Sequence, residues 1–319
     1  MRLLIFCVLL LGAAGCGKTS APLKLDFTSS NRFVSGNRTV TVGDTLAARI
    51  YADDTGADPK GITNLKITVD YAPRLAPFAY PTPLTNFQLS SVPSMPQVVY
   101  LDSMLAPNAL PTELLYTTVF GVRTTVGTER WTFTATDKAG NSRSRAFTIS
   151  QRRTDSVATY HDYTLQLNLL ATTGVRRFID LKSGLAVPRF TALNQANAAT
   201  LQPMLDAILL PDGSLASPDY FSGSRLNGLS TTNWPTGNRN ATRFVRTNLD
   251  DNSFVLQTDT TTYRTQYKSA TPASIITGLT TRQVYAFRIP GTPARYGLLL
   301  VANTTSGLQL RVRVMRQSL

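Results

Sequence analysis

The sequence predicts a mainly β protein, in which an N-terminal antiparallel β-sandwich is followed by a second β-rich domain, with α+β as the alternative for that second part. Three observations support this prediction. The 319 residues are enough for two globular domains. Apolar and polar residues alternate along much of the chain, as they do in strands with one buried face. The breaks between these runs are rich in Gly, Pro, Asn and Asp, which favour turns.

The first 16 residues have the pattern of a secretory signal. Met1 and Arg2 precede an apolar run at residues 3–11 that is too short to span a bilayer, and small residues follow up to Cys16. This pattern resembles the lipobox of bacterial lipoproteins, and an ordinary cleaved signal is the alternative. The resemblance implies that residues 1–15 are removed and that Cys16 carries more than one acyl chain, so that residues 16–22 tether the protein to a membrane.

The same stretch contains a second motif. Residues 12–19 match the phosphate-binding loop pattern G-x-x-x-x-G-K-[ST]. Such a loop leads into a helix whose N–H groups hold phosphate, whereas here Pro22 is followed by strand-like alternation at residues 23–27. We therefore expect no nucleotide.

Residues 23–152 are expected to form the sandwich. Segments with strand-like alternation lie at residues 23–27, 39–42, 46–51, 65–69, 97–101, 114–120, 130–135 and 145–149. This number of short strands is typical of a sandwich. Residues 71–111 are rich in proline, which cannot donate to a strand ladder, so we expect a loop or edge insert there. A binding loop is the alternative.

Residues 131–141 combine an aromatic-rich strand with the turn Asp137-Lys138-Ala139-Gly140-Asn141. Gly and Asn tolerate the positive φ that lets the chain reverse. The segment resembles the last hairpin of bacterial immunoglobulin-like and cadherin-like domains. Because residues 23–152 contain no cysteine, the resemblance implies the disulfide-free kind of immunoglobulin-like sandwich.

A polar linker is predicted at residues 153–160 and a β-rich C-terminal domain at residues 161–319. Alternation at residues 163–169 and 177–181 starts this domain, a short helix is expected between residues 192 and 210, and Asn248 or Asp250 can cap a later helix. The chain ends in a hairpin of residues 296–302 and 308–314. On its last strand Gln309, Arg311 and Arg313 share a face that is either solvated or turned to a partner.

Four segments of the second half, residues 214–218, 239–244, 283–288 and 295–301, look similar to a C-terminal module of uncharacterised lipoproteins from Bacteroidota. This resemblance implies a secreted, non-catalytic module and names no ligand.

The residue counts exclude several chemistries. The chain has one histidine, His161, two cysteines, both within the first 16 residues, and two glutamates, Glu113 and Glu129. Residues 17–319 therefore cannot build a zinc site, a thiol enzyme or a disulfide scaffold. A serine triad would need His161, which we expect on the surface, and no G-x-S-x-G elbow is present. Aspartate pairs leave a hydrolase open, but most aspartates lie in turns, so no catalytic residue and no cofactor is predicted.

Two weak binding sites remain as hypotheses. Asp53, Asp54 and Asp58 offer clustered oxygen ligands for Ca²⁺, with a plain loop as the alternative. Trp234 lies in a Gly/Asn/Thr-rich loop, with Tyr220 and Phe221 nearby in sequence. These rings could stack on a glycan, with a partly buried Trp234 in the core as the alternative.

The formal net charge of +13 is spread along the chain without a long basic run or a nucleic-acid module. Such a field suits anionic lipopolysaccharide or lipid headgroups, and plain solubility also explains it. We expect a lipid-anchored cell-envelope protein of the outer membrane, structural, adhesive or spacing, without catalysis. Whether it faces the periplasm or the cell surface stays open. A surface glycan-binding protein is the first alternative and a carboxylate-dependent hydrolase the second.

Overall fold

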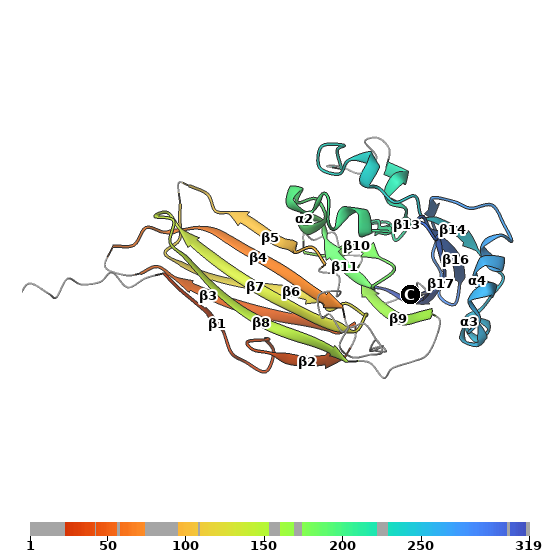
Figure 1. Ribbon diagram of the computed structural model, residues 1–319, viewed down its shortest axis with the longest axis horizontal. Helices are drawn as coiled ribbons and strands as arrows, with labels where there is room; N and C mark the ends of the chain where they lie inside the picture. The colour runs from red at the N-terminus through yellow and green to blue at the C-terminus, as the bar shows by residue number, and fades with distance from the viewer. Residues whose placement is uncertain are drawn as a thin grey trace, which may run out of the picture.

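The protein is mainly β in a computed structural model (Figure 1). The model describes residues 23–41, 43–55, 58–73, 95–107, 109–152, 160–168, 174–221, 229–304 and 307–316. Cys16 and the predicted signal and tether lie outside these residues. Within them, no helix combines the length and the apolar character needed to cross a membrane.

The N-terminal unit is an immunoglobulin-like sandwich of two sheets. The first sheet has the order β1-β3-β6, with β1 at Lys24–Phe27, β3 at Thr45–Asp53 and β6 at Glu113–Gly121. The second has the order β2-β8-β7-β4-β5, with β2 at Arg38–Thr41, β8 at Ser142–Arg152, β7 at Gly127–Asp137, β4 at Ile62–Pro73 and β5 at Val98–Met104. These orders correspond to the ABE and GFC sheets of immunoglobulin domains.

One pairing departs from the predicted antiparallel sandwich. Strand β2 runs parallel to β8, with Arg38 opposite Ile149 and Thr41 opposite Arg152. The chain therefore pairs first with the β3 sheet through β1 and then crosses to the other sheet through β2. Parallel pairing needs no hairpin, so alternation along β2 could not reveal it.

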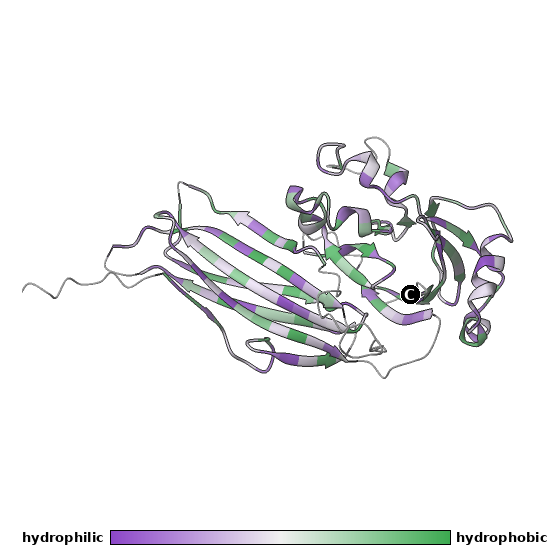
Figure 2. Cartoon of the chain, viewed as in Figure 1, coloured by the Kyte–Doolittle hydropathy of each residue, from purple (hydrophilic) through white to green (hydrophobic). Residues whose placement is uncertain are grey.

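Alternation decides which side chains fill the sandwich. Along β7 every second residue from Gly127 to Asp137 is buried. In Figure 2 hydrophobic and hydrophilic residues accordingly alternate along the strands of the sandwich. The rings of Trp131, Phe133, Phe120 and Phe147 meet between the two sheets, with Phe120 and Trp131 4.0 Å apart. The strand predictions for this unit are confirmed.

The predicted proline-rich insert is partly strand. Strand β5 lies inside residues 71–111 and pairs with β4 at the edge of its sheet, which agrees with an edge location. Residues 74–94 of the insert lie outside the described residues.

The C-terminal unit contains two five-stranded sheets. One has the order β11-β10-β12-β13-β15, with β11 at Leu185–Pro188, β10 at Arg176–Asp180, β12 at Ala207–Leu209, β13 at Leu215–Ala216 and β15 at Ile275–Ile276. The other has the order β14-β16-β17-β18-β9, with β14 at Arg243–Arg246, β16 at Val284–Ile289, β17 at Arg295–Asn303, β18 at Leu308–Met315 and β9 at Tyr160–Leu167. The final hairpin is confirmed.

Helices of this unit are short. They are α2 at Arg189–Ala192, α3 at Asp251–Leu256 and α4 at Thr260–Tyr267, with 3-10 turns η4 at Gln195–Asn197, η5 at Gln202–Met204, η6 at Pro218–Phe221 and η7 at Thr236–Asn238. The predicted cap is confirmed, because Asp250 accepts a hydrogen bond from the Ser253 N–H at the start of α3.

Apolar side chains form layers in the C-terminal unit. One core lies between the two sheets and includes Ile179, Leu209, Phe287 and Leu310. A second core, around Phe254 and Tyr263, lies between α3, α4 and the outer face of the β16 and β17 strands. The sheet of β14, β16, β17, β18 and β9 is therefore covered on both faces.

The charged face of β18 was expected to meet solvent or a partner, but it binds within the chain. Arg313 Nη1 donates to the carbonyl oxygens of Phe254, Val255 and Gln257, at the end of α3. Arg311 and Arg313 both donate to Asp162 on the neighbouring strand β9. The alternation was interpreted correctly, but helix α3 covers this face.

Candidate functional site

The main feature linking the two units is their joint. One continuous apolar cluster runs from the interior of the sandwich to the C-terminal unit, and it contains Val98 and Tyr100 of β5 together with Phe178 and Val187 of β10 and β11. The rings of Tyr100 and Phe190 meet edge to face at 5.9 Å. Helix α2 contacts β5 as well as β10 and β11, so the apolar side chains of the two units form one core that runs through α2.

Asn197 closes the free edge of the sandwich at β5. Its side-chain oxygen accepts from the Val99 N–H at 2.9 Å, and its amide nitrogen donates to the Val99 carbonyl at 2.8 Å. Thr191 Oγ1 donates to the Tyr100 carbonyl at 2.6 Å. Asn197 and Thr191 are fully buried. These two side chains replace the missing neighbouring strand and satisfy backbone groups that would be costly to bury unpaired.

A second contact lies at the turn between β6 and β7. The backbone N–H and the hydroxyl of Thr124 both donate to the Ser183 carbonyl, and the same hydroxyl lies 2.8 Å from Nε2 of His161. Gly184 has a φ of 65°, and a Cβ there would overlap the Thr124 side chain. The sandwich and the C-terminal unit therefore approach too closely at this point for any residue but glycine.

His161 was expected on the surface, and this expectation is wrong. Only 5% of the residue is exposed. It faces inward from β9 and packs beside Tyr163, with ring centroids 4.9 Å apart. A histidine at the start of a domain is buried here because the joint covers that start.

Next to the joint, the partly exposed Lys182 and the buried Asp180 and Asp206 form a charged cluster. Lys182 Nζ lies 3.0 Å from Asp206 Oδ1 and 3.7 Å from Asp180 Oδ1, and both aspartates are fully buried. Burial raises the pKa of Asp206 to about 7, although the Lys182 charge opposes this shift. Burial alone would lower the pKa of Lys182, but the carboxylates of Asp180 and Asp206 raise it above its ordinary value.

Asp180 and Asp206 form a buried carboxylate pair, the kind of arrangement that the hydrolase alternative requires. The oxygens of Asp206 accept from Leu181 N–H, Lys182 and Asn240. Those of Asp180 accept from the Lys182 N–H and the Ser183 hydroxyl. A hydrolytic pair needs an oxygen directed at substrate, whereas here every carboxylate oxygen is engaged inside the protein. The geometry suits a structural network that fixes the chain between β10 and β12.

The predicted aromatic platform does not match the structure. Trp234 is fully buried and Phe221 is 2% exposed, while Tyr220 is partly buried. The indole N–H donates to the Asn238 carbonyl, and the Arg239 guanidinium donates to the carbonyls of Trp234 and Phe221. These hydrogen bonds from Arg239 hold the loop in a conformation that covers Trp234. Trp234 lies in the core, as the alternative interpretation of this loop expected.

The predicted calcium ligands act separately. Asp54 accepts from the N–H groups of Lys60 and Gly61, Asp53 accepts from Thr55, and Asp58 forms an ion pair with Lys60. Among the described residues no group of three or more His, Cys, Asp or Glu side chains gathers as a metal would require. The loop alternative fits these contacts.

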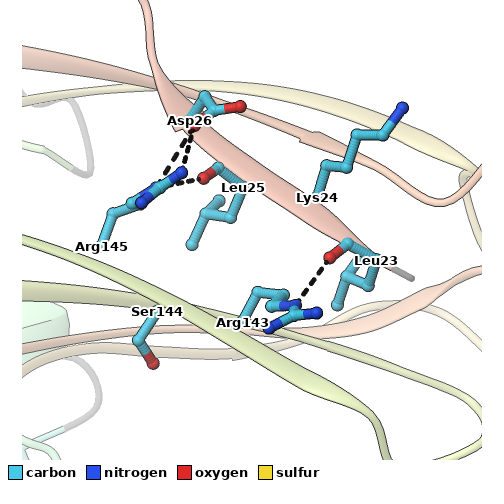
Figure 3. A pocket seen from close by; sticks show the side chains of 7 residues that line it. All are labelled: Leu23, Lys24, Leu25, Asp26, Arg143, Ser144 and Arg145. Atoms are coloured by element: carbon cyan, nitrogen blue, oxygen red, sulfur yellow. Dashed lines mark hydrogen bonds and ion pairs between the residues drawn. The ribbon is translucent and has the colours of Figure 1, made fainter. Parts of the chain in front are cut away.

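A groove lies between the edges of the two sheets of the sandwich, as Figure 3 shows. It has a volume of about 260 Å³ and lies between β1 and the first half of β8. Arg143 Nε donates to the Leu23 carbonyl, and Arg145 donates to the Leu25 carbonyl and to Asp26. These arginines bridge the two edges, so the polar groups that line the groove are engaged within the chain.

Sequence reasoning missed the residues of the joint, namely Thr124, Gly184, Thr191 and Asn197. Their residue types are common in turns, and only the partner segments, about 60 to 100 residues away in the sequence, show what they bind.

Comparison with known proteins gives no assignment. No family model matches the chain, and no curated protein matches it. A solved structure of a DUF4466 family protein from Parabacteroides merdae aligns over 93% of this chain and 99% of its own, with a TM-score of 0.33 and 11% identity. The sporulation control protein Spo0M from Bacillus subtilis aligns over 93% and 91%, with a TM-score of 0.24 and 9% identity. Similarities of this size assign neither a family nor a function.

Proposed function

We propose that this protein is a lipid-anchored, non-enzymatic component of the bacterial outer membrane, in which the sandwich is a rigid spacer that carries the C-terminal unit away from the membrane. The lipobox-like segment ending at Cys16 supports the anchor. The arrangement of the two units supports the spacer.

The observation that carries the proposal is the position of the first described strand. Lys24 of β1 pairs with Asp53, at one end of β3. The opposite end of β3 is Thr45, which accepts a hydrogen bond from Arg176 of the C-terminal unit. The nine residues of β3 span about 30 Å. A tether that enters at β1 thus begins at the far end of the sandwich from the C-terminal unit (Figure 1).

The joint supports a spacer rather than a flexible linker. The two units share an apolar cluster, and buried side chains of one bond to the backbone of the other. Interfaces between independently moving domains are more polar and less continuous. A rigid joint transmits the orientation of the sandwich to the C-terminal unit.

Lipid attachment is tested by metabolic labelling with radioactive palmitate and fractionation of cells that express the full chain. We expect the natural chain in the membrane fraction with label, and Cys16→Ala without label and outside that fraction. Cys7→Ala is the matched control and keeps both, because Cys7 lies in the predicted signal. Label on Cys16→Ala, or its unchanged retention in the membrane fraction, would contradict the anchor.

A further inference from the structure

Among the described strands, β6 has no strand neighbour on one edge, although it also contacts β11 of the C-terminal unit. In the described part of the chain β6 pairs with β3 only, and it ends the β1-β3-β6 sheet. The Asp54 N–H donates to the Thr112 carbonyl, and the Val122 N–H donates to the Asp44 carbonyl. Because hydrogen-bonded pairs alternate along an antiparallel ladder, the even-numbered residues of β6 bond to β3. Residues 113, 115, 117 and 119 therefore direct their backbone groups away from the sheet.

The outer face of the same strand carries exposed apolar side chains beside the polar Glu113 and Thr117. Leu115 is 60% exposed and Val119 51% exposed, and Tyr51 lies beside Leu115 on β3 with 37% exposure. Folded proteins usually protect sheet edges with charge, proline or a covering element, and a long edge with exposed apolar side chains is a ready template for another strand. One outward carbonyl, that of Val119, accepts from the Tyr100 hydroxyl at 3.2 Å.

We propose that β6 pairs with β6 of a second copy of this chain, antiparallel and centred on Thr117. In this register Thr117 faces Thr117, and Leu115 of each copy faces Val119 of the other. Threonine pairs and apolar pairs are both favourable as direct cross-strand neighbours. The pairing joins the two sheets into one continuous sheet of six strands.

Charge complementarity supports this register over others. Centring on Thr117 places Glu113 of one copy opposite Gly121 of the other. A Cβ at Gly121 would overlap the Arg176 guanidinium, so this cation lies directly over that position. Within the described part of the chain Arg176 donates to Thr45 Oγ1 and forms no ion pair with a carboxylate. Glu113 of the second copy, whose Oε1 accepts from the Tyr51 hydroxyl of its own chain, brings a carboxylate to this cation.

The proposed β6–β6 contact is small, and it is antiparallel. A single strand edge buries less than the roughly 1,200 Å² of a standard stable interface, so the dimer is weak and depends on concentration. Antiparallel pairing turns the long axes of the two copies in opposite directions. If the proposed anchor holds, and only then, such a dimer links copies on two facing membranes, which corresponds to an adhesive role.

Disulfide trapping tests the register in the full chain. With Cys7 and Cys16 replaced by Ser, no other cysteine remains, so the result does not depend on lipid attachment. A hydrogen-bonded antiparallel pair holds Cα atoms about 5.5 Å apart, within reach of a disulfide. Thr117→Cys should therefore form a covalent dimer under mild oxidation, at least about tenfold more than the exposed control Ser144→Cys.

Leu115→Cys distinguishes this register from random collision. Under the proposed pairing the two copies of residue 115 lie about 13 Å apart, at about 3.3 Å for each of four residues, which is too far for a disulfide. Adding Val119→Lys to Thr117→Cys should abolish trapping while the circular dichroism spectrum of the monomer is retained. Equal trapping of Thr117→Cys and Ser144→Cys, or of Thr117→Cys and Leu115→Cys, would overturn the proposal.

Discussion

Asp206 is the residue whose ionisation depends most clearly on the fold. Below a pH of about 4 both the folded and the unfolded chain hold its proton. As the pH rises toward 7, the unfolded chain releases the proton first, because burial raises the folded pKa to about 7. The folded state then holds more protons than the unfolded state, so the free energy of unfolding should fall across this window.

Asp206→Asn should remove this part of the pH dependence. The substitution keeps the shape of the side chain and abolishes its titration, so the free energy of unfolding should change less between pH 4.5 and pH 7 than in the natural chain. Urea unfolding at several pH values measures both slopes. The exposed Asp58 provides the control, because Asp58→Asn should retain the natural slope. An unchanged slope in Asp206→Asn would mean that Asp206 is ionised throughout.

At the residue scale the sequence could show which side chains are present but not which are covered. The counts of His, Cys and Glu were available from the sequence, whereas the burial of His161 and Trp234 was not. His161 is covered by the segment around Thr124, which is distant in the sequence. Trp234 is covered by its own loop, which folds around Arg239. Hydrophobic rings in a Gly-rich loop look exposed until the partner of that loop is known.

At the scale of elements, alternation predicted the strands well, because each strand has one face in a core. Helix α4 was not predicted. Its sequence is rich in threonine, and Tyr263 is its one buried residue, so it shows little helical periodicity. Asp259, which accepts from the Thr261 N–H, is the local signal that could have indicated the start of this helix.

Helix α3 should depend on Arg313 of β18. The guanidinium is nearly buried, and its Nη1 donates hydrogen bonds to three carbonyl oxygens at the end of the helix. Arg313→Met leaves these carbonyls and part of Asp162 without a donor, so the free energy of unfolding should fall by about 3 kcal/mol. Hydrogen exchange in residues 251–257 should rise, which urea unfolding and exchange mass spectrometry measure together.

Arg311→Met is the matched control for this element. Arg311 also donates to Asp162, but its side chain is 36% exposed. It lies 5.5 Å from the centre of the Phe254 ring, and among the described residues its hydrogen bonds go to Asp162 and not to the α3 carbonyls. We expect a loss of about 1 kcal/mol or less and natural exchange in α3. Equal effects of the two substitutions would show that Asp162, rather than the end of α3, is what Arg313 stabilises.

At the scale of the whole molecule, the sequence predicts two units and a polar segment between them, but it gives no sign of how firmly they are joined. The joint is built from contacts between segments far apart in the chain, such as Asn197 with Val99 and Ser183 with Thr124. A polar linker is compatible with either free or fixed units. The shared core and the buried hydrogen bonds favour fixed units, and the spacer hypothesis requires them.

The distance between the two ends of the molecule tests this requirement most directly. Lys138 lies in the turn at the far end of β7 from the joint, Lys268 follows α4, and both are exposed. Spin labels on Lys138→Cys and Lys268→Cys, in a chain with Cys7 and Cys16 replaced by Ser, report their separation by pulsed electron resonance. We predict one narrow distribution at a distance greater than the length of β7, which is about 36 Å for its 11 residues. A broad distribution, or one that extends to shorter distances, would contradict a rigid spacer.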